Sequence, residues 1–167
     1  TSSIDNEGKS KVAANLAAAI AQVGQSVLLI DTDFQSPYQH QFWKLPLKKG
    51  LSEVLANQDE FKAIAWKVMD NLDILTAGSK PSNPLACLDY NQMKSLIKQV
   101  SNLYDFVIID TPPILVTADA LILGPMTDGV LLVSRPGVID DQRANVTQEK
   151  LKRSNCNVLG IIVNGIT

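Results

Sequence analysis

The chain has 167 residues, of which 46% are hydrophobic and 19% charged, so it is long enough for one domain with a sizeable core and too short for two ordinary ones. A formal net charge of −2 argues against a general affinity for nucleic acid. Cys87 and Cys156 lie far apart and the chain has one histidine, which argues against a disulfide framework and a zinc site. We therefore expect a single domain over residues 1–167 with no nucleic-acid partner.

Helical patterns and short apolar runs alternate along the chain. In chain order they predict a helix at 10–23, a strand at 27–31, a helix at 59–69, a strand at 72–76, a helix at 89–102, strands at 106–110 and 130–134, a helix at 140–153 and a strand at 158–163. The strands are rich in Val, Ile and Leu without alternation, which is typical of parallel strands covered on both faces. The pattern predicts an α/β fold of three layers, with helices on both faces of a mostly parallel sheet.

The first ten residues, TSSIDNEGKS, nearly fit the phosphate-binding pattern G-x-x-x-x-G-K-[ST], with Ser3 in place of the first glycine. Backbone N–H groups where the first helix begins can face a phosphate, Lys9 adds a positive charge, and Ser10 offers a hydroxyl to Mg²⁺. A buried strand normally precedes such a loop, and only two residues do so here. We therefore expect this chain to be a fragment, with the central strand before the loop upstream of it.

Carboxylates follow two of the predicted strands. Asp31 and Asp33 lie two positions apart at the end of one apolar run, and Asp110 ends another. In an open α/β sheet, ligands bind at the carboxyl ends of the strands, so these acids and the loop are expected to converge. Mg²⁺ prefers oxygen ligands and keeps several waters, so one hydroxyl, one or two carboxylates and phosphate oxygens would suit it. The alternative is that the aspartates are ordinary caps of strand ends.

These motifs, in this order, resemble the deviant-Walker P-loop ATPases, the class of the MinD and ParA partitioning proteins. Within that class the chain is most similar to the bacterial tyrosine kinases (BY-kinases) of capsular and exopolysaccharide synthesis. The likeness covers nearly the whole chain and rests on TSS…EGKS, VLLIDTDFQSP, GLSEVL, YDFVIIDTPP, DGVLLVSRPG and VLGIIVNGI. It implies a P-loop NTPase fold and an ATP- and Mg²⁺-dependent protein-tyrosine kinase that regulates polymerisation and export of the polysaccharide.

The resemblance also implies roles for single residues. Asp33 would be the base that accepts the proton of a substrate tyrosine, with Lys9 and Asp31 completing the catalytic set. Mg²⁺ would be held by Ser10, Asp31 and Asp110. The residues implied in nucleotide binding are Ser3, Asn6, Glu7, Gly8, Lys9, Ser10, Lys11, Arg135 and Asn164. Asn164 would contact adenine, whereas for Arg135 a plain surface position is the alternative.

The chain departs from the family pattern at four positions. Ile4 stands where MinD and ParA carry a signature lysine. The kinase loop usually reads Pro-Gly where this chain has Asp5 and Asn6, and an arginine commonly stands in place of Gln35. Asn6 can take the positive φ that the turn needs, whereas Asp5 would repel a triphosphate unless its side chain points to solvent or pairs with a cation. These departures favour the alternative of a degenerate, non-catalytic nucleotide-sensing domain, and Ile4 argues against a MinD-type ATPase switch.

Partners and location follow from the resemblance alone. It implies ATP and ADP as ligands, a membrane-embedded polysaccharide co-polymerase or its activator segment as partner, and assembly of several copies of the chain. The expected location is cytoplasmic, at the inner face of the bacterial plasma membrane, through segments outside this chain. The three tyrosines are dispersed and predict no phosphoacceptor cluster.

Overall fold

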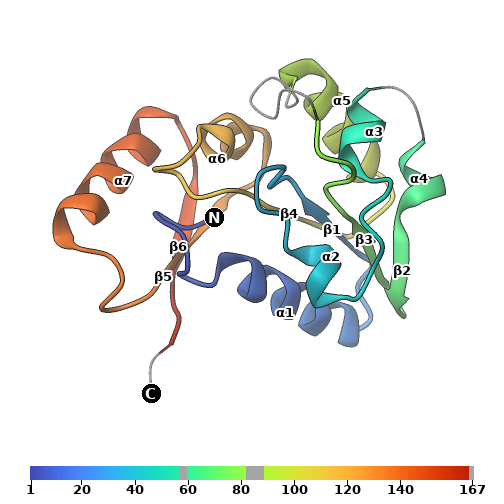
Figure 1. The fold of residues 1–167 in the computed structure, drawn as a ribbon, viewed down its shortest axis with the longest axis horizontal. Helices are drawn as coiled ribbons and strands as arrows, with labels where there is room; N and C mark the ends of the chain where they lie inside the picture. Colours follow the sequence, from blue (N-terminus) through green and yellow to red (C-terminus); the bar gives the residue numbers. More distant parts are fainter. Residues whose placement is uncertain (57–59, 82–88, 166–167) are drawn as a thin grey trace. The chain divides into compact units, whose positions relative to one another are not determined.

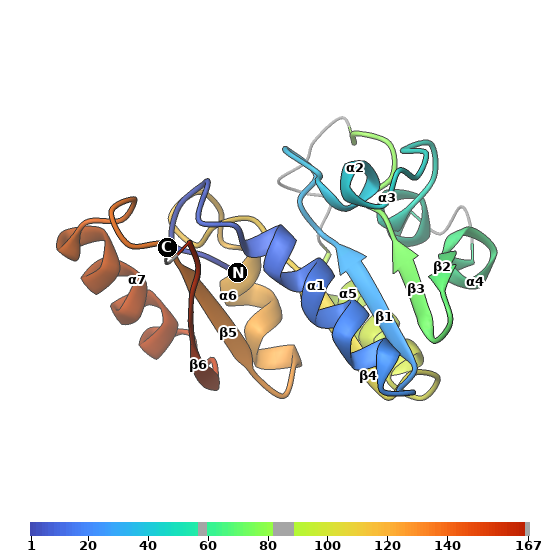
Figure 2. The same ribbon diagram turned by 90° about the horizontal axis from the view of Figure 1, so that it is seen from below.

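The computed structural model describes residues 1–56, 60–81 and 89–165, and the chain divides into two compact units. The P-loop unit consists of Thr1–Val12 and Thr111–Thr167, and the carboxylate unit of Ala13–Asp110. Helix α1 (Lys9–Gln22) begins in the first and continues in the second. Each unit has its own sheet, as Figures 1 and 2 show.

The carboxylate unit is built on a four-stranded sheet with the order β2-β3-β1-β4. Strands β1 (Val27–Asp31), β3 (Leu72–Leu75) and β4 (Phe106–Asp110) run parallel, as predicted. Figure 2 shows α1 in front of this sheet and α5 (Tyr90–Val100) behind it. Alanines on one side of α1 pack against β1 and β3, because small side chains let a helix approach a sheet closely; the buried members are Ala14, Ala17, Ala21, Val27, Leu29, Leu72 and Ile74.

The predicted helix at 59–69 is wrong over its second half. Its first half is the short helix α4 (Phe61–Ile64), and residues beyond it form the strand β2 (Trp66–Met69), which pairs antiparallel with β3. The two residues between β2 and β3 favour a hairpin over a continuous helix. Asn71, the second of them, has a φ of +63°, a conformation that asparagine tolerates and that tight hairpins need. Residue 59 lies outside the described residues.

Two short helices in the segment between β1 and β2 were not predicted: α2 (Gln39–Phe42) and α3 (Leu51–Leu55). A helix of one turn has too few residues to show a 3.6-residue period. Helix α5 falls within its predicted range, and the carboxylate of Asp89 caps it by accepting two backbone N–H groups.

The P-loop unit contains the parallel pair β5 (Val130–Ser134) and β6 (Val158–Val163), both as predicted. Its helices are α6 (Asp119–Leu123), the 3₁₀ turn η2 (Gly124–Met126) and α7 (Asp141–Arg153). Its core joins α6 and α7 to β5 through Ile114, Ala120, Val130 and Leu151. At the position of the strand expected before the loop, Ser2 forms a single parallel bridge with Val133.

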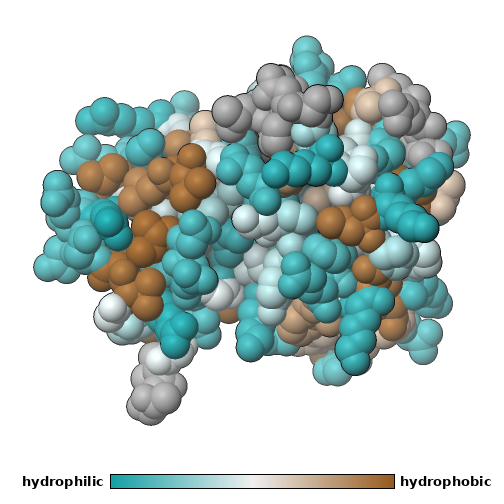
Figure 3. Space-filling view, viewed as in Figure 1, coloured by the Kyte–Doolittle hydropathy of each residue, from teal (hydrophilic) through white to brown (hydrophobic). Residues whose placement is uncertain are grey.

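The surface of the P-loop unit carries apolar side chains, visible in Figure 3 around the region of α6 and α7. Strand β6 is the most exposed strand, with Leu159 at 62% and Ile161 at 63% of their full accessibility. None of the helices within the described residues is long and apolar enough to cross a membrane.

Candidate functional site

The predicted phosphate-binding loop adopts the backbone of an anion site. Asn6 has a φ of +66° and Gly8 a φ of +88°, and α1 begins immediately afterwards at Lys9. Alternation of left-handed and right-handed residues turns successive N–H groups into one concavity, and the start of a helix adds its positive dipole end. The expectation that Asn6 can keep the turn is therefore confirmed, and the backbone of this segment has the geometry that suits a phosphate.

The side chains at the start of α1 support the same reading. The ammonium Nζ of Lys9 donates to the hydroxyl Oγ of Ser10 at 3.2 Å, so the group predicted for the phosphates lies beside the group predicted for Mg²⁺. Asp5 is exposed, which meets the condition under which a carboxylate is tolerated in this loop. Lys11, also predicted as a site residue, is exposed on the first turn of the helix.

Three backbone bonds hold the start of the loop in the P-loop unit. Thr1 accepts a hydrogen bond from the N–H of Val133 at 2.8 Å, which ties it to β5. The carbonyl of Ser2 accepts from the N–H of Ile114 at 2.9 Å, and the carbonyl of Ser3 from the next residue at 3.1 Å. Ser3 is buried in this position, so its side chain replaces the expected glycine inside the fold.

The predicted adenine-side residues lie next to the loop. Asn164, just beyond β6, donates from Nδ2 to the carbonyl of Glu7 at 2.9 Å. A side chain at Gly8 would overlap this amide of Asn164, so the motif glycine is required by close approach as well as by its φ. Arg135 follows β5, and its backbone N–H donates to the carboxylate of Glu7 at 3.2 Å. The P-loop unit thus brings together the loop and both residues, and their contact with adenine stays a prediction.

In the carboxylate unit, two of the predicted acids stand side by side. Asp31 ends β1 and Asp110 ends β4, and the register of the parallel strands pairs them directly. Both are buried, with 0% and 1% of their accessible surface exposed. The expectation that strand-end carboxylates converge is confirmed for this pair.

Asp31 is held by backbone groups that follow it. Its Oδ1 accepts from the N–H of Asp33 at 3.0 Å, and its Oδ2 accepts from the N–H groups of Tyr38 and Gln39, both at 3.0 Å. Burial, and after it the negative charge of Asp110, raise the pKa of this carboxyl group to about 7, although the three N–H groups act in the opposite direction. Near neutral pH this group therefore exchanges a proton with solvent.

Asp33, the predicted base, is 3% exposed and keeps a defined orientation. One of its oxygens, Oδ1, accepts from the N–H of Ser36 at 2.8 Å, and its own N–H donates to Asp31. The carboxylates of Asp31 and Asp33 thus fix the loop after β1 through hydrogen bonds to its backbone. The role of Asp33 as a base stays a prediction.

The carboxylate pair fits a divalent cation. Asp110 accepts from the Nε2 of Gln39 at 2.8 Å through Oδ2, whereas its Oδ1 is buried with no hydrogen-bond partner in the part of the chain that the structure describes. A buried carboxylate oxygen without a donor is destabilising, and a cation would relieve it. No group of three or more His, Cys, Asp or Glu side chains in residues 1–56, 60–81 and 89–165 could hold a metal ion alone. Mg²⁺ needs fewer protein ligands than that, because it retains waters and phosphate oxygens.

Two residues next to this pair were not predicted as site residues from the sequence. Gln39 is fully buried and donates to Asp110, and Thr32 donates from Oγ1 to the carbonyl of the same aspartate at 2.8 Å. The signal for Thr32 was its place between the two aspartates of β1's end. Gln39 carried no signal, because its contact depends on the turn between residues 33 and 39.

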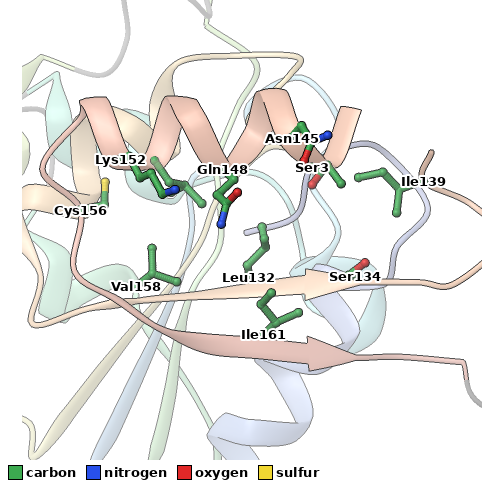
Figure 4. A pocket seen from close by; sticks show the side chains of 12 residues that line it. Ser3, Leu132, Ser134, Ile139, Asn145, Gln148, Lys152, Cys156, Val158 and Ile161 are labelled. Atoms are coloured by element: carbon green, nitrogen blue, oxygen red, sulfur yellow. The ribbon is translucent and has the colours of Figure 1, made fainter. Parts of the chain in front are cut away.

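A cavity of about 530 Å³ lies between α7 and the β5–β6 pair in the P-loop unit, shown in Figure 4. Its floor is apolar, and α7 adds Asn145, Gln148 and Lys152. Of the predicted site residues only Ser3 is among those that line it. The cavity is therefore distinct from the anion site formed by the loop backbone.

Comparison with known proteins gives the same picture as the motifs. Residues 6–140 match the model of the AAA domain family. The chain is 42% identical over 166 residues to the tyrosine-protein kinase YwqD of Bacillus subtilis, covering 99% of this chain and 70% of that protein. It is 36% identical to the tyrosine-protein kinase etk of Escherichia coli, covering 99% of this chain and 23% of that much longer protein.

Solved structures agree. The kinase domain of the Escherichia coli tyrosine kinase ETK matches with a TM-score of 0.94 and 35% identity, covering 99% of this chain and 66% of that one. The MinD protein of Pyrococcus horikoshii, solved with Mg-ADP, matches with a TM-score of 0.81 at 24% identity over 98% of this chain and 67% of that one, a likeness of fold alone. The α/β P-loop fold predicted from the sequence is thereby confirmed.

Proposed function

The chain belongs to the bacterial tyrosine-protein kinases, and on that premise we propose that it binds ATP with Mg²⁺ and transfers the γ-phosphoryl group to a protein tyrosine. The observation that carries this proposal is the start of α1. There a loop with two residues at positive φ ends in Lys9, whose ammonium group lies 3.2 Å from the hydroxyl of Ser10. Both groups are what a triphosphate and its cation require.

Phosphoryl transfer asks a protein for positioning and for neutralisation of charge. The loop amides and Lys9 would bind the phosphate oxygens. Ser10, Asp31 and Asp110 would hold Mg²⁺, which when bound supplies positive charge to the phosphates. The tyrosine oxygen forms a bond to the γ-phosphorus while the bond to the bridging oxygen of ADP breaks, and the tyrosine proton passes to a carboxylate, for which we propose Asp33.

The environment of Asp33 supports that choice. Its Oδ1 is engaged by the N–H of Ser36, which fixes the side chain, and a fixed carboxylate can accept a proton without first reorienting. Asp31 is already bound by three N–H groups, and Asp110 accepts from Gln39. Among the three predicted acids, Asp33 is thus the one not assigned to the cation.

Transfer of label from γ-labelled ATP to the protein's own tyrosines and to a synthetic tyrosine peptide tests the proposal. We expect Asp33→Asn to reduce transfer by at least about 100-fold, the lower range for loss of a general base, while the affinity for Mg-ADP stays within about twofold. Asp128→Asn, which neutralises an exposed carboxylate, should leave transfer unchanged. Binding of Mg-ADP without transfer by the unsubstituted protein would contradict the kinase assignment and support a nucleotide-sensing domain.

We further propose that this domain works at the inner face of the bacterial plasma membrane, beside a membrane-embedded polysaccharide co-polymerase, and that several copies assemble. Two relatives support the setting by their names: a putative tyrosine-protein kinase in the cps region of Klebsiella pneumoniae, 34% identical, and the putative tyrosine-protein kinase CapB of Staphylococcus aureus, also 34% identical. Sedimentation of the protein with and without Mg-ATP tests the assembly, since a single monomeric species under both conditions would contradict it.

A further inference from the structure

Glu7, in the phosphate-binding loop, contacts the residues that follow two strands. Its carbonyl accepts from the Nδ2 of Asn164, beyond β6, at 2.9 Å. Its carboxylate Oε1 accepts from the N–H of Arg135, beyond β5, at 3.2 Å. The two strand ends are themselves joined, because the N–H of Asn164 donates to the carbonyl of Ser134 at 2.8 Å. All four residues belong to the P-loop unit.

The same carboxylate also binds the loop from inside. Its second oxygen, Oε2, accepts from the N–H of Ser3 at 2.8 Å and from the N–H of Ile4 at 2.9 Å. Glu7 is fully buried, with 0% of its surface exposed. A buried carboxylate that receives three N–H groups is satisfied, and hydrogen bonds to a charged acceptor are about twice as strong as those between neutral groups.

This arrangement divides the amides of the loop between two acceptors. The N–H groups of Ser3 and Ile4 are taken by Glu7 and are turned to the inside of the loop. The later part of the loop, from Asn6 with φ +66° to the start of α1, keeps the conformation that presents amides to an anion. The Glu7 carboxylate therefore fixes the first half of the loop, and the amides of the second half are the ones that can bind phosphate.

We propose that Glu7 is a positioning residue: its buried carboxylate holds the phosphate-binding loop in its binding conformation before nucleotide arrives and ties the loop to the ends of β5 and β6. The proposal rests on the nucleotide binding proposed above. Glu7 acts through the backbone of Ser3, Ile4 and Arg135 and does not itself touch phosphate. Because a preorganised loop binds its ligand without the cost of ordering, loss of the carboxylate weakens binding even though a negative charge is removed.

Two carboxylates in one loop provide a matched pair of variants. Glu7→Gln and Asp5→Asn each remove one negative charge close to the phosphate site, one from a buried group and one from an exposed group. We expect Glu7→Gln to weaken Mg-ADP binding by about tenfold, the equivalent of losing about one charge-assisted hydrogen bond, with the melting temperature within a few degrees of the parent. Asp5→Asn should leave binding unchanged or strengthen it, because only repulsion is lost. Equal strengthening by both variants, or unchanged binding by Glu7→Gln, would overturn the proposal.

Amide hydrogen exchange on the unsubstituted protein tests the same idea without a variant. The N–H groups of Ser3, Ile4 and Arg135 should exchange slowly in the absence of nucleotide, and addition of Mg-ADP should change their rates less than about threefold. Fast exchange that slows only on addition of Mg-ADP would show that nucleotide orders the loop and would overturn the proposal. Because this measurement needs no variant, it decides the question even if Glu7→Gln does not fold. Failure of the unsubstituted protein to bind Mg-ADP would instead reject the proposed function. Slow exchange of the three amides would in that case still show that the Glu7 carboxylate holds the loop in place.

Discussion

Substitution of Asp110 by asparagine would remove one of two negative charges buried side by side at the ends of β1 and β4. The neighbouring Asp31 has a pKa raised from 3.8 to about 7, with burial as the larger cause and the charge of Asp110 as the second. A raised pKa means that the folded state binds a proton that the unfolded state has released. The free energy of unfolding therefore falls as the pH rises from about 4 to about 7.

The size of this effect follows from the shift. At about 1.4 kcal/mol per pKa unit, the full shift of Asp31 corresponds to about 4 kcal/mol, reached when the group is ionised above pH 7. Since Asp110 is the smaller of the two causes, we assign it about 1 kcal/mol. Asparagine keeps an acceptor for the Nε2 of Gln39, so the packing at this point is largely retained.

The assay is denaturant unfolding at pH 5 and at pH 8. The parent should lose stability between the two pH values, and Asp110→Asn should lose about 1 kcal/mol less, because its Asp31 titrates at a lower pH. The comparison between two pH values removes any loss that does not depend on pH. Asp70→Asn, at a carboxylate with 97% of its side chain exposed, is the control and should behave like the parent. An Asp110→Asn variant with the parent's pH dependence would refute the reasoning.

Three further predictions concern other parts of the chain. Gly8→Ala should abolish measurable Mg-ADP binding, because the glycine has a φ of +88° and a methyl group would overlap Asn164; calorimetry checks this, and binding within threefold of the parent would contradict it. Tyr104→Phe should lower the free energy of unfolding by about 1 kcal/mol, since the hydroxyl donates to Asp73 at 2.6 Å. In the parent, burial and this bond raise the pKa of Tyr104, so stability should fall above pH 10 and less so in the variant, as denaturant unfolding at pH 9 and 11 would show. Asp89→Ala should cost about 1 kcal/mol, because the side chain caps α5 through two N–H groups, and an unchanged melting temperature would argue against this cap.

Much of the fold could be predicted because it depends on local patterns. The apolar runs that became β1, β4, β5 and β6 were located to the residue, since each is a short apolar segment without the alternation of polar residues, as is typical of parallel strands. Strand β2 was missed because it lies at the edge of its sheet, with Trp66 42% exposed, and its sequence carries no such run. Its antiparallel pairing with β3 depends on the turn at Asn71, and the strand could be predicted only by recognising that turn as the loop of a hairpin.

The site was predictable where chemistry and sequence spacing coincide. The positive φ of Asn6 and the pairing of Asp31 with Asp110 followed from loop geometry and from strand ends, and the structure confirms both. The hydrogen bond that joins Glu7 to Arg135 was not predictable, because the two residues lie 128 positions apart in the chain. Long-range contacts of this kind are set by packing, which leaves no local trace in the sequence.

A calorimetric titration of Mg-ADP into the protein, beside the same titration into Lys9→Ala, tests the central claim most directly. We expect micromolar binding to the parent and a loss of at least about 100-fold in the variant, because Lys9 places a positive charge at the start of α1, where the phosphates are proposed to bind. Circular dichroism confirms that both proteins are folded. Absence of binding to the folded parent, or equal binding to the variant, would contradict the claim that this loop is a nucleotide site.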